Sequence, residues 1–258
     1  MKNFIQKVAL VTGTSRPNGI GAAICRKLAQ NGTDVFFTHW SSYDAATGYE
    51  DADTTWPEAF NEELKSHGIR SSHLEINLAE EDAAARLLNE VENVFGQPTI
   101  LINNATYCVE VDFLQMTSGI LDAHYAVNVR GTCMLSVEFA KRLQGKGGGR
   151  IVNLVSGQDK SPQPGNLAYV TTKGAISTFT KTLAAELAQH HITVNAIDPG
   201  PTDSGWMNNE IQEFLKPKFP MGRIGVPEDA ARLIAFLVSD EARWITGQII
   251  HSDGGFWD

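Results

Sequence analysis

A tyrosine and a lysine at helical spacing carry the most specific chemistry in this sequence. In the segment NLAYVTTKGAIS, Tyr169 and Lys173 stand four positions apart, so in a helix both side chains project from one face. A tyrosine normally keeps its proton to about pH 10, but a neighbouring ammonium favours the phenolate and makes the phenol a usable acid or base. A solvent-facing helix pair is the alternative interpretation of so short a spacing.

A serine before this pair supplies a third candidate group. Ser156 follows the apolar segment RIVNLV and precedes Tyr169 by thirteen residues. The apolar segment predicts a strand, so the serine hydroxyl is expected at the carboxyl end of that strand. There it could hydrogen-bond a substrate carbonyl, whereas an ordinary turn serine is the alternative.

A glycine-rich segment near the amino terminus predicts a loop that holds a dinucleotide. In VTGTSRPNGIGAAI, Gly13, Gly19 and Gly21 lie between a predicted strand at 8–12 and a predicted helix at 22–29. Gly13 can make the turn out of the strand, and the other two let backbone approach a pyrophosphate at the helix amino terminus. Five residues separate the first two glycines, which is a long spacing, and a purely structural turn is the alternative.

The end of the second predicted strand bears on the choice of dinucleotide. An NAD site usually presents Asp or Glu there, but this sequence has His39. Arg16 in the glycine-rich loop, with Ser41 and Ser42 nearby, could instead meet a 2'-phosphate. NADP(H) is therefore the favoured cofactor, with NAD(H) as the alternative because Asp44 could fold back toward the ribose and repel a phosphate.

The elements that must position these groups alternate along the chain. Short Val/Ile/Leu-rich runs are separated by longer helical patterns, which predicts an α/β fold, a Rossmann doubly wound parallel sheet of about seven strands with helices on both faces. We expect one domain over 1–258, with ligands at the carboxyl ends of the strands. The expected strands are 8–11, 35–38, 73–76, 100–102, 151–155, 192–197 and 248–250.

One segment interrupts this alternation. Residues 39–57, here called the inserted segment, are too many for an ordinary connection from strand to helix. A lid over a bound ligand and a solvated loop are both open interpretations. The segment combines acidic and aromatic side chains, namely Asp44, Glu50, Asp51, Asp53, Trp40, Tyr43, Tyr49 and Trp56.

Composition narrows the class of partner. A formal net charge of -9 over 258 residues argues against nucleic acid or an anionic membrane surface, so a small-molecule partner is expected. We find no pattern typical of a signal peptide or a membrane span and expect a cytoplasmic protein. Cys25, Cys108 and Cys133 lack metal-ligand spacing, so we expect no metal and assign these thiols no chemistry.

Taken in chain order, these motifs resemble the short-chain dehydrogenase/reductase family over nearly the whole length. The resemblance adds NNA at 103–105, Asn128, PGP at 199–201 and the closing segment 221–255, and is closest in pattern to 3-oxoacyl-acyl-carrier-protein reductase-like members. It implies that Tyr169 donates the proton and that Ser156 orients the carbonyl. It also implies that Asn128 holds a water in a proton relay beside Lys173, which tunes the tyrosine and holds the ribose.

The resemblance also implies a set of cofactor contacts. Three positions depart from the family pattern: Asn77 replaces an acid, Thr106 replaces a glycine, and Ser204 replaces a threonine. The amide of Asn77 could still bond the adenine amino group through its carbonyl. The implied contacts are Gly13, Ser15, Arg16, Gly19, Ile20, Gly21, His39, Asn77, Leu78, Asn104, Ala105, Tyr169, Lys173, Pro199, Gly200 and Thr202.

These features predict an NADP(H)-dependent reductase that converts a ketone, with 3-oxoacyl thioesters as one class, to a secondary alcohol. The long glycine spacing resembles enoyl-acyl-carrier-protein reductases, but those usually place six residues between Tyr and Lys, and here there are three. Met134 and Ala185 stand where a dedicated carrier-protein reductase is expected to have Arg. An enoyl-thioester reductase and a non-catalytic dinucleotide sensor remain the alternatives.

The resemblance carries two structural expectations as well. A homodimer or homotetramer is expected through the two long helices, which would bury Met134, Leu135 and Phe139, or Phe179 and Leu183. The segment 206–219 resembles the mobile substrate lid of the family, with ordinary helix packing as the alternative.

Overall fold

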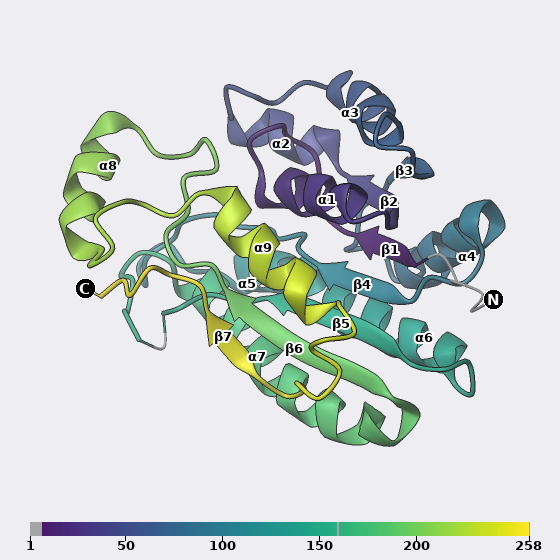
Figure 1. Cartoon of the computed structure of the whole chain (residues 1–258). Coiled ribbons are helices and arrows are strands. Elements are labelled where there is room, and N and C mark those ends of the chain that lie inside the picture. Colours follow the sequence, from purple (N-terminus) through teal and green to yellow (C-terminus); the bar gives the residue numbers. More distant parts are fainter. Residues whose placement is uncertain (1–6, 159, 258) are drawn as a thin grey trace.

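Seven parallel strands form one sheet in the order β3-β2-β1-β4-β5-β6-β7 (Figure 1). The structure is a computed structural model that describes residues 7–158 and 160–257, so the ends of the predicted domain, Met1 and Asp258, lie outside it. The strand order reverses between β1 and β4, which is where doubly wound folds bind their ligands. The strands are β1 Val8–Val11, β2 Asp34–His39, β3 Ser71–Glu75, β4 Ile100–Asn103, β5 Gly149–Leu154, β6 Ile192–Asp198 and β7 Ile249–His251.

The predicted fold class is confirmed. Each strand lies within two residues of its expected position. Four of them, β1, β2, β4 and β6, are buried along their whole length, and the Val, Ile, Leu and Phe residues that this burial requires made them recognisable. The first helix, α1 (Ile20–Gln30), begins two residues earlier than expected, directly after Gly19.

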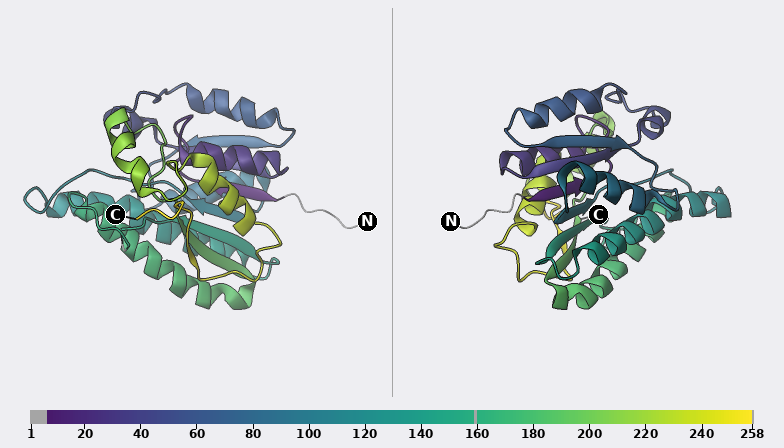
Figure 2. Two further views of the ribbon diagram at one scale, coloured as in Figure 1. Left: turned by 60° about the vertical axis from the view of Figure 1, so that its left-hand side comes forward. Right: turned by 90° about the vertical axis from the view of Figure 1, so that its right-hand side faces the viewer.

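Helices cover both faces of the sheet, as the two further views show (Figure 2). On one face, α1, α3 (Trp56–Lys65) and α9 (Pro227–Leu237) pack on β1, β2 and β4. On the other, α4 (Ala83–Phe95), α6 (Thr132–Leu143) and α7 (Leu167–Leu187) bury a second core. Three shorter helices, α2 (Ser41–Thr47), α5 (Ser118–His124) and α8 (Asn209–Leu215), complete the fold, and a π-helix at Tyr125–Gly131 joins α5 to α6.

The residues expected to bury a subunit interface lie inside the protein instead. Leu135 and Phe139 are fully buried and Leu183 is nearly so, all three in the core beneath α6 and α7. The expectation is therefore wrong for them, because residues four apart on α6 face the sheet and not the solvent. Phe179 packs partly against the same core, and only Met134 is substantially exposed.

The inserted segment contains a helix that the sequence reading missed. After His39 at the end of β2, α2 spans Ser41–Thr47, and a turn then leads to α3 at Trp56. No residue of α2 is fully buried, but Tyr43 and Asp44 are half-buried, and their contacts with Cys108 and Arg16 hold the helix in place.

Across residues 7–158 and 160–257, no helix has both the length and the apolar character that a membrane crossing requires.

Core packing predicts a large difference between a buried and an exposed apolar substitution. Phe139→Ala in α6 should lower the free energy of unfolding by about 3–5 kcal/mol, because it opens a cavity in the core. Val94→Ala, a control at an exposed position of α4, should change it by less than about 0.5 kcal/mol. Urea unfolding of both variants tests this, and equal losses would contradict the burial of Phe139 beneath α6.

Candidate active site

A cleft lies at the carboxyl ends of the strands beside the switch point between β1 and β4. Its volume is about 210 Å³. Residues of the glycine-rich loop, the end of β2, the inserted segment and the loop after β4 line it, so the predicted cofactor region forms one site. The lining residues that the sequence predicted are Gly13, Ser15, Arg16, Gly19, Ile20, Gly21, His39, Leu78, Asn104 and Ala105.

The glycine-rich loop brings backbone unusually close to its neighbours. Gly13 has φ +72°, and a Cβ there would lie 2.5 Å from the Cα of Ala105. A Cβ on Gly21 would lie 2.6 Å from the Oγ1 of Thr14. Gly19 caps α1 without a side chain to occupy the first amides of the helix. Amide donors at a helix amino terminus and a backbone cradle of this kind fit the pyrophosphate of a dinucleotide.

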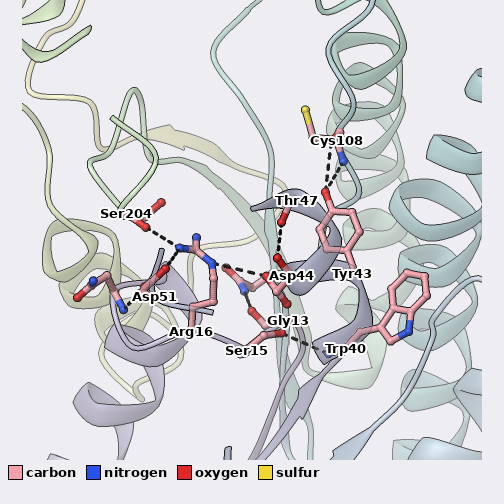
Figure 3. A network of polar contacts seen from close by, with 12 residues as sticks. Gly13, Ser15, Arg16, Trp40, Tyr43, Asp44, Thr47, Asp51, Cys108 and Ser204 are labelled. Atoms are coloured by element: carbon pink, nitrogen blue, oxygen red, sulfur yellow. Dashed lines mark hydrogen bonds and ion pairs between the residues drawn. The ribbon is translucent and has the colours of Figure 1, made fainter. Parts of the chain in front are cut away.

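Arg16 is held inside the cleft wall by the inserted segment, as Figure 3 shows. Its Nη1 donates to Asp51 Oδ1 at 2.5 Å and to the Ser204 carbonyl at 3.2 Å. Its Nε lies 3.5 Å from Asp44 Oδ1, and its guanidinium carbon lies 3.6 Å from the centre of the Tyr49 ring. The residue expected to meet a 2'-phosphate is therefore already bound to two carboxylates.

A histidine pair occupies the expected ribose position. His39 Nδ1 shares a hydrogen bond with Ser41 Oγ at 3.1 Å, and Nε2 shares one with His73 Nδ1 at 3.1 Å. Burial, and then the nearby His73, lower the pKa of His39, so its neutral form is favoured. Glu75 also reaches this position and accepts a hydrogen bond from the Ser41 amide at 3.1 Å.

The predicted proton-transfer group assembles between α7 and the end of β5. Tyr169 and Lys173 project from α7, and Tyr169 hydrogen-bonds the side chain of Ser156. Lys173 Nζ lies 5.4 Å from the centre of the Tyr169 ring and donates to the Leu154 carbonyl at 2.8 Å. The predicted serine, tyrosine and lysine therefore meet at the carboxyl end of a central strand.

Burial dominates the ionisation of this group. It raises the pKa of Tyr169 above its ordinary value, although the hydrogen bond from Ser156 opposes that shift. It also lowers the pKa of Lys173 to about 8. The influence of Lys173 and of a bound oxidised nicotinamide on the Tyr169 proton stays a prediction. Tyr169 keeps its proton at neutral pH, which is the form that a proton donor requires.

Asn128 braces the site through its side-chain amide. Its Oδ1 accepts from the Tyr107 amide at 2.7 Å, and its Nδ2 donates to the Tyr107 carbonyl at 2.8 Å and to Thr172 Oγ1 at 3.0 Å. Thr106 Oγ1 donates to the same Oδ1 at 3.3 Å. Asn128 lies in the π-helix, an irregularity that often marks functional sites. A water held by Asn128 stays a prediction.

Several predicted contacts lie outside the walls of the cleft. Tyr169 and Lys173 flank it, and Pro199, Gly200 and Thr202 follow β6, where Thr202 Oγ1 donates to the Pro199 carbonyl at 3.1 Å. The carbonyl expected to reach the adenine, that of Asn77, already accepts from the Ala79 amide at 2.9 Å. That oxygen closes a local turn, so its contact with adenine stays a prediction.

Sequence reasoning missed the role of two residues at this site. The hydroxyl of Tyr43 donates to the Cys108 carbonyl at 3.2 Å and accepts from the Cys108 amide at 3.0 Å. Cys108 is half-buried near Tyr169 and Lys173, where it affects the pKa of both. Cys108 stands five residues after Asn103, in the loop that follows β4. That position in the sequence could have indicated that Cys108 lies near the site.

The expected substrate lid is a mixture of buried and exposed residues. Met207 and Phe219 are buried, whereas Phe214 in α8 is 65% exposed. Their burial accords with ordinary packing, and movement of this segment stays a prediction.

Comparison with known proteins gives matches over almost the whole chain. A family model described as enoyl-(acyl carrier protein) reductase matches residues 13–257. An uncharacterized oxidoreductase, YjdA of Bacillus subtilis, is 52% identical over 99% of both chains. The 3-oxoacyl-[acyl-carrier-protein] reductase FabG of Aquifex aeolicus is 35% identical over 97% of both. A blue fluorescent protein from a metagenomic library, solved in complex with NADPH, is 29% identical with a TM-score of 0.85 and 99% of both chains covered.

Burial of Lys173 predicts a pH-dependent stability. Its pKa falls from 10.5 to about 8 on folding, so between these values the unfolded chain binds more protons and stability rises with pH. Relative to Lys173→Met, the wild-type free energy of unfolding should increase by roughly 2 kcal/mol from pH 7 to pH 10. Urea unfolding at both values measures this difference, and a difference that stays constant would contradict the shifted pKa.

Proposed function

The chain belongs to the short-chain dehydrogenase/reductase family and is an NAD(P)-dependent oxidoreductase, and from this premise we propose that it reduces a ketone to a secondary alcohol with NADP(H). One observation carries the proposal. Ser156, protonated Tyr169 and buried Lys173 meet beside a backbone cradle that fits a pyrophosphate. The residues 1–258 act as one dinucleotide-binding domain in this proposal.

The side chains divide the proton chemistry between them. Nicotinamide, when bound, supplies the hydride. The Ser156 and Tyr169 hydroxyls are adjacent, so a carbonyl oxygen near both can accept two hydrogen bonds that strengthen as negative charge develops. Tyr169 then gives its proton to that oxygen. Lys173, largely protonated at neutral pH because its pKa is about 8, stabilises the phenolate that remains.

This arrangement favours carbonyl over enoyl reduction. Two hydroxyl donors at one point suit an oxygen atom that must be oriented and protonated. The family model's description names enoyl reduction, so that activity is kept as the second candidate. A non-catalytic dinucleotide sensor is the third candidate function. The grouping of Ser156, Tyr169 and Lys173 argues against it, because a sensor needs no proton donor.

The preference for NADP(H) is supported by charge around the ribose end of the cleft. The end of β2 carries His39, whose neutral form is favoured, in place of a carboxylate, and Arg16 is an anion-binding group on the cleft wall. The NADPH bound by the blue fluorescent protein supports the same choice by similarity. Glu75 and Asp44 keep NAD(H) as the alternative.

Substrate class and assembly follow from the surface of the two long helices. Similarity to FabG supports 3-oxoacyl thioesters, whereas exposed Met134 and Ala185 lack the charge expected for an acidic carrier protein. A ketone on a small acyl or alkyl chain is the proposed class of substrate.

A homodimer or homotetramer that forms through the outer faces of α6 and α7 is proposed as well. The cytoplasmic location stays a prediction.

Removal of one hydroxyl tests the proposed proton donor. Tyr169→Phe should lower kcat for ketone reduction by about 10²- to 10⁴-fold, because the ketone oxygen loses its acid. Binding of NADPH, measured by calorimetry, should persist. Tyr125→Phe, a control at an exposed position of the π-helix, should retain activity. Full activity in the Tyr169 variant would refute the assignment.

Substitution of Arg16 tests the cofactor preference. Arg16→Gln should weaken NADPH binding at least about ten-fold through loss of a charge-assisted phosphate contact, while NADH binding changes much less. Arg86→Gln, which alters an exposed ion pair on α4, serves as the control. Equal weakening of both dinucleotides in calorimetry would count against a 2'-phosphate site at Arg16.

A further inference from the structure

We propose that Asp44 and Asp51 are specificity-determining residues that take the place of cofactor phosphates at Arg16 and Ser15, and that NADP(H) must displace them to bind. The inference rests on the proposed function. It assigns a role to the inserted segment, which the reductase chemistry itself does not use.

The ion pairs of Arg16 are formed inside the protein and not at its surface. The side chains of Arg16, Asp44 and Asp51 are exposed by only 10%, 13% and 14%. Charged pairs held away from water are screened weakly, so they fix the guanidinium firmly. The Tyr49 ring against the guanidinium adds a cation-π contact.

Both carboxylates bind donors that suit phosphate. Asp51 Oδ1 accepts from Arg16, and its Oδ2 accepts from the Asn18 amide at 3.2 Å. Asp44 pairs with the same arginine and accepts a hydrogen bond from Ser15. A guanidinium, a loop amide and a serine hydroxyl form the donor set that glycine-rich loops offer to phosphate oxygens.

A second anchor holds the inserted segment across the cleft. The double hydrogen bond of Tyr43 with Cys108 ties α2 to the loop after β4, while Asp51 ties the end of the segment to the glycine-rich loop. The cleft beneath has a volume of about 210 Å³. Because Asp44 and Asp51 already occupy donors of Arg16 and Asn18, a phosphate can bind these donors only when the two carboxylates move away.

Hydration favours displacement of the Asp44 carboxylate by a phosphate. Burial raises the pKa of Asp44, which means that its carboxylate is solvated less well in the closed position than in water. Release into solvent therefore recovers hydration, while the arginine keeps an anionic partner. Because the 2'-phosphate brings the additional charge, competition from these two residues should affect NADPH more strongly than NADH.

Two amide substitutions test the competition. Asp44→Asn with Asp51→Asn should tighten NADPH binding at least about five-fold, with a smaller gain for NADH, since the charged competitors of Arg16 are gone. Glu50→Gln with Asp53→Asn is the matched control, because it removes two negative charges from exposed positions of the inserted segment. Calorimetric Kd values equal to or weaker than wild type in the double variant would overturn the proposal. Thermal unfolding without cofactor verifies that both variants are folded.

Hydrogen exchange of the wild-type protein tests the displacement without any substitution. Saturation with NADPH should protect amides 13–21 and increase exchange at amides 43–52. Protection of both segments would mean that the inserted segment clamps the cofactor, and the proposal would be wrong. If neither dinucleotide binds the wild type, the proposed function fails and the inference with it. If NADPH binds and ketone is reduced while segment 43–52 does not respond, only the inference fails.

Discussion

The proposed chemistry of this site depends on one buried ammonium. Lys173 is only 6% exposed, and its proposed role requires it to hold its charge beside Tyr169 at the pH of the reaction. The Leu154 carbonyl at the end of β5 accepts a hydrogen bond from the ammonium, and burial lowers the pKa of Lys173 only to about 8, so the ammonium stays largely charged near neutrality. In a deeper position, or without a hydrogen-bond partner, the lysine would lose its proton and become neutral. In an exposed position, water would weaken its electrostatic effect on Tyr169.

The surrounding elements hold that ammonium and its tyrosine in place. The parallel sheet brings the end of β5 under α7, and Asn128 links α7, through Thr172, to the backbone of Tyr107. On the other side of that loop, Tyr43 bonds both backbone groups of Cys108. The inserted segment therefore contacts both the cleft and the loop beside Tyr169 and Lys173.

The sequence was sufficient for the sheet, the glycine-rich loop and the grouping of Ser156 with Tyr169 and Lys173, because these follow from local periodicity and from the rule that strand ends share an edge. It was insufficient for features that depend on contacts between segments far apart in the chain. The direction in which Leu135 and Phe139 face depends on the sheet beneath α6, and the pairing of Arg16 with Asp44 and Asp51 depends on how the inserted segment folds back. The burial that raises the pKa of Tyr169 was likewise not visible in the sequence, because spacing reports only the nearby lysine.

The most direct test of the account follows the transferred hydrogen. NADPH carrying deuterium at the reactive nicotinamide carbon is incubated with the protein and one substrate at a time. The substrates are a 3-oxoacyl thioester, a small ketone and an enoyl thioester. The products are analysed by mass spectrometry. We expect a secondary alcohol with deuterium on the carbinol carbon from the ketone substrates and no labelled product from the enoyl thioester. Deuterium on the β-carbon of a saturated thioester, with no labelled alcohol, would contradict it.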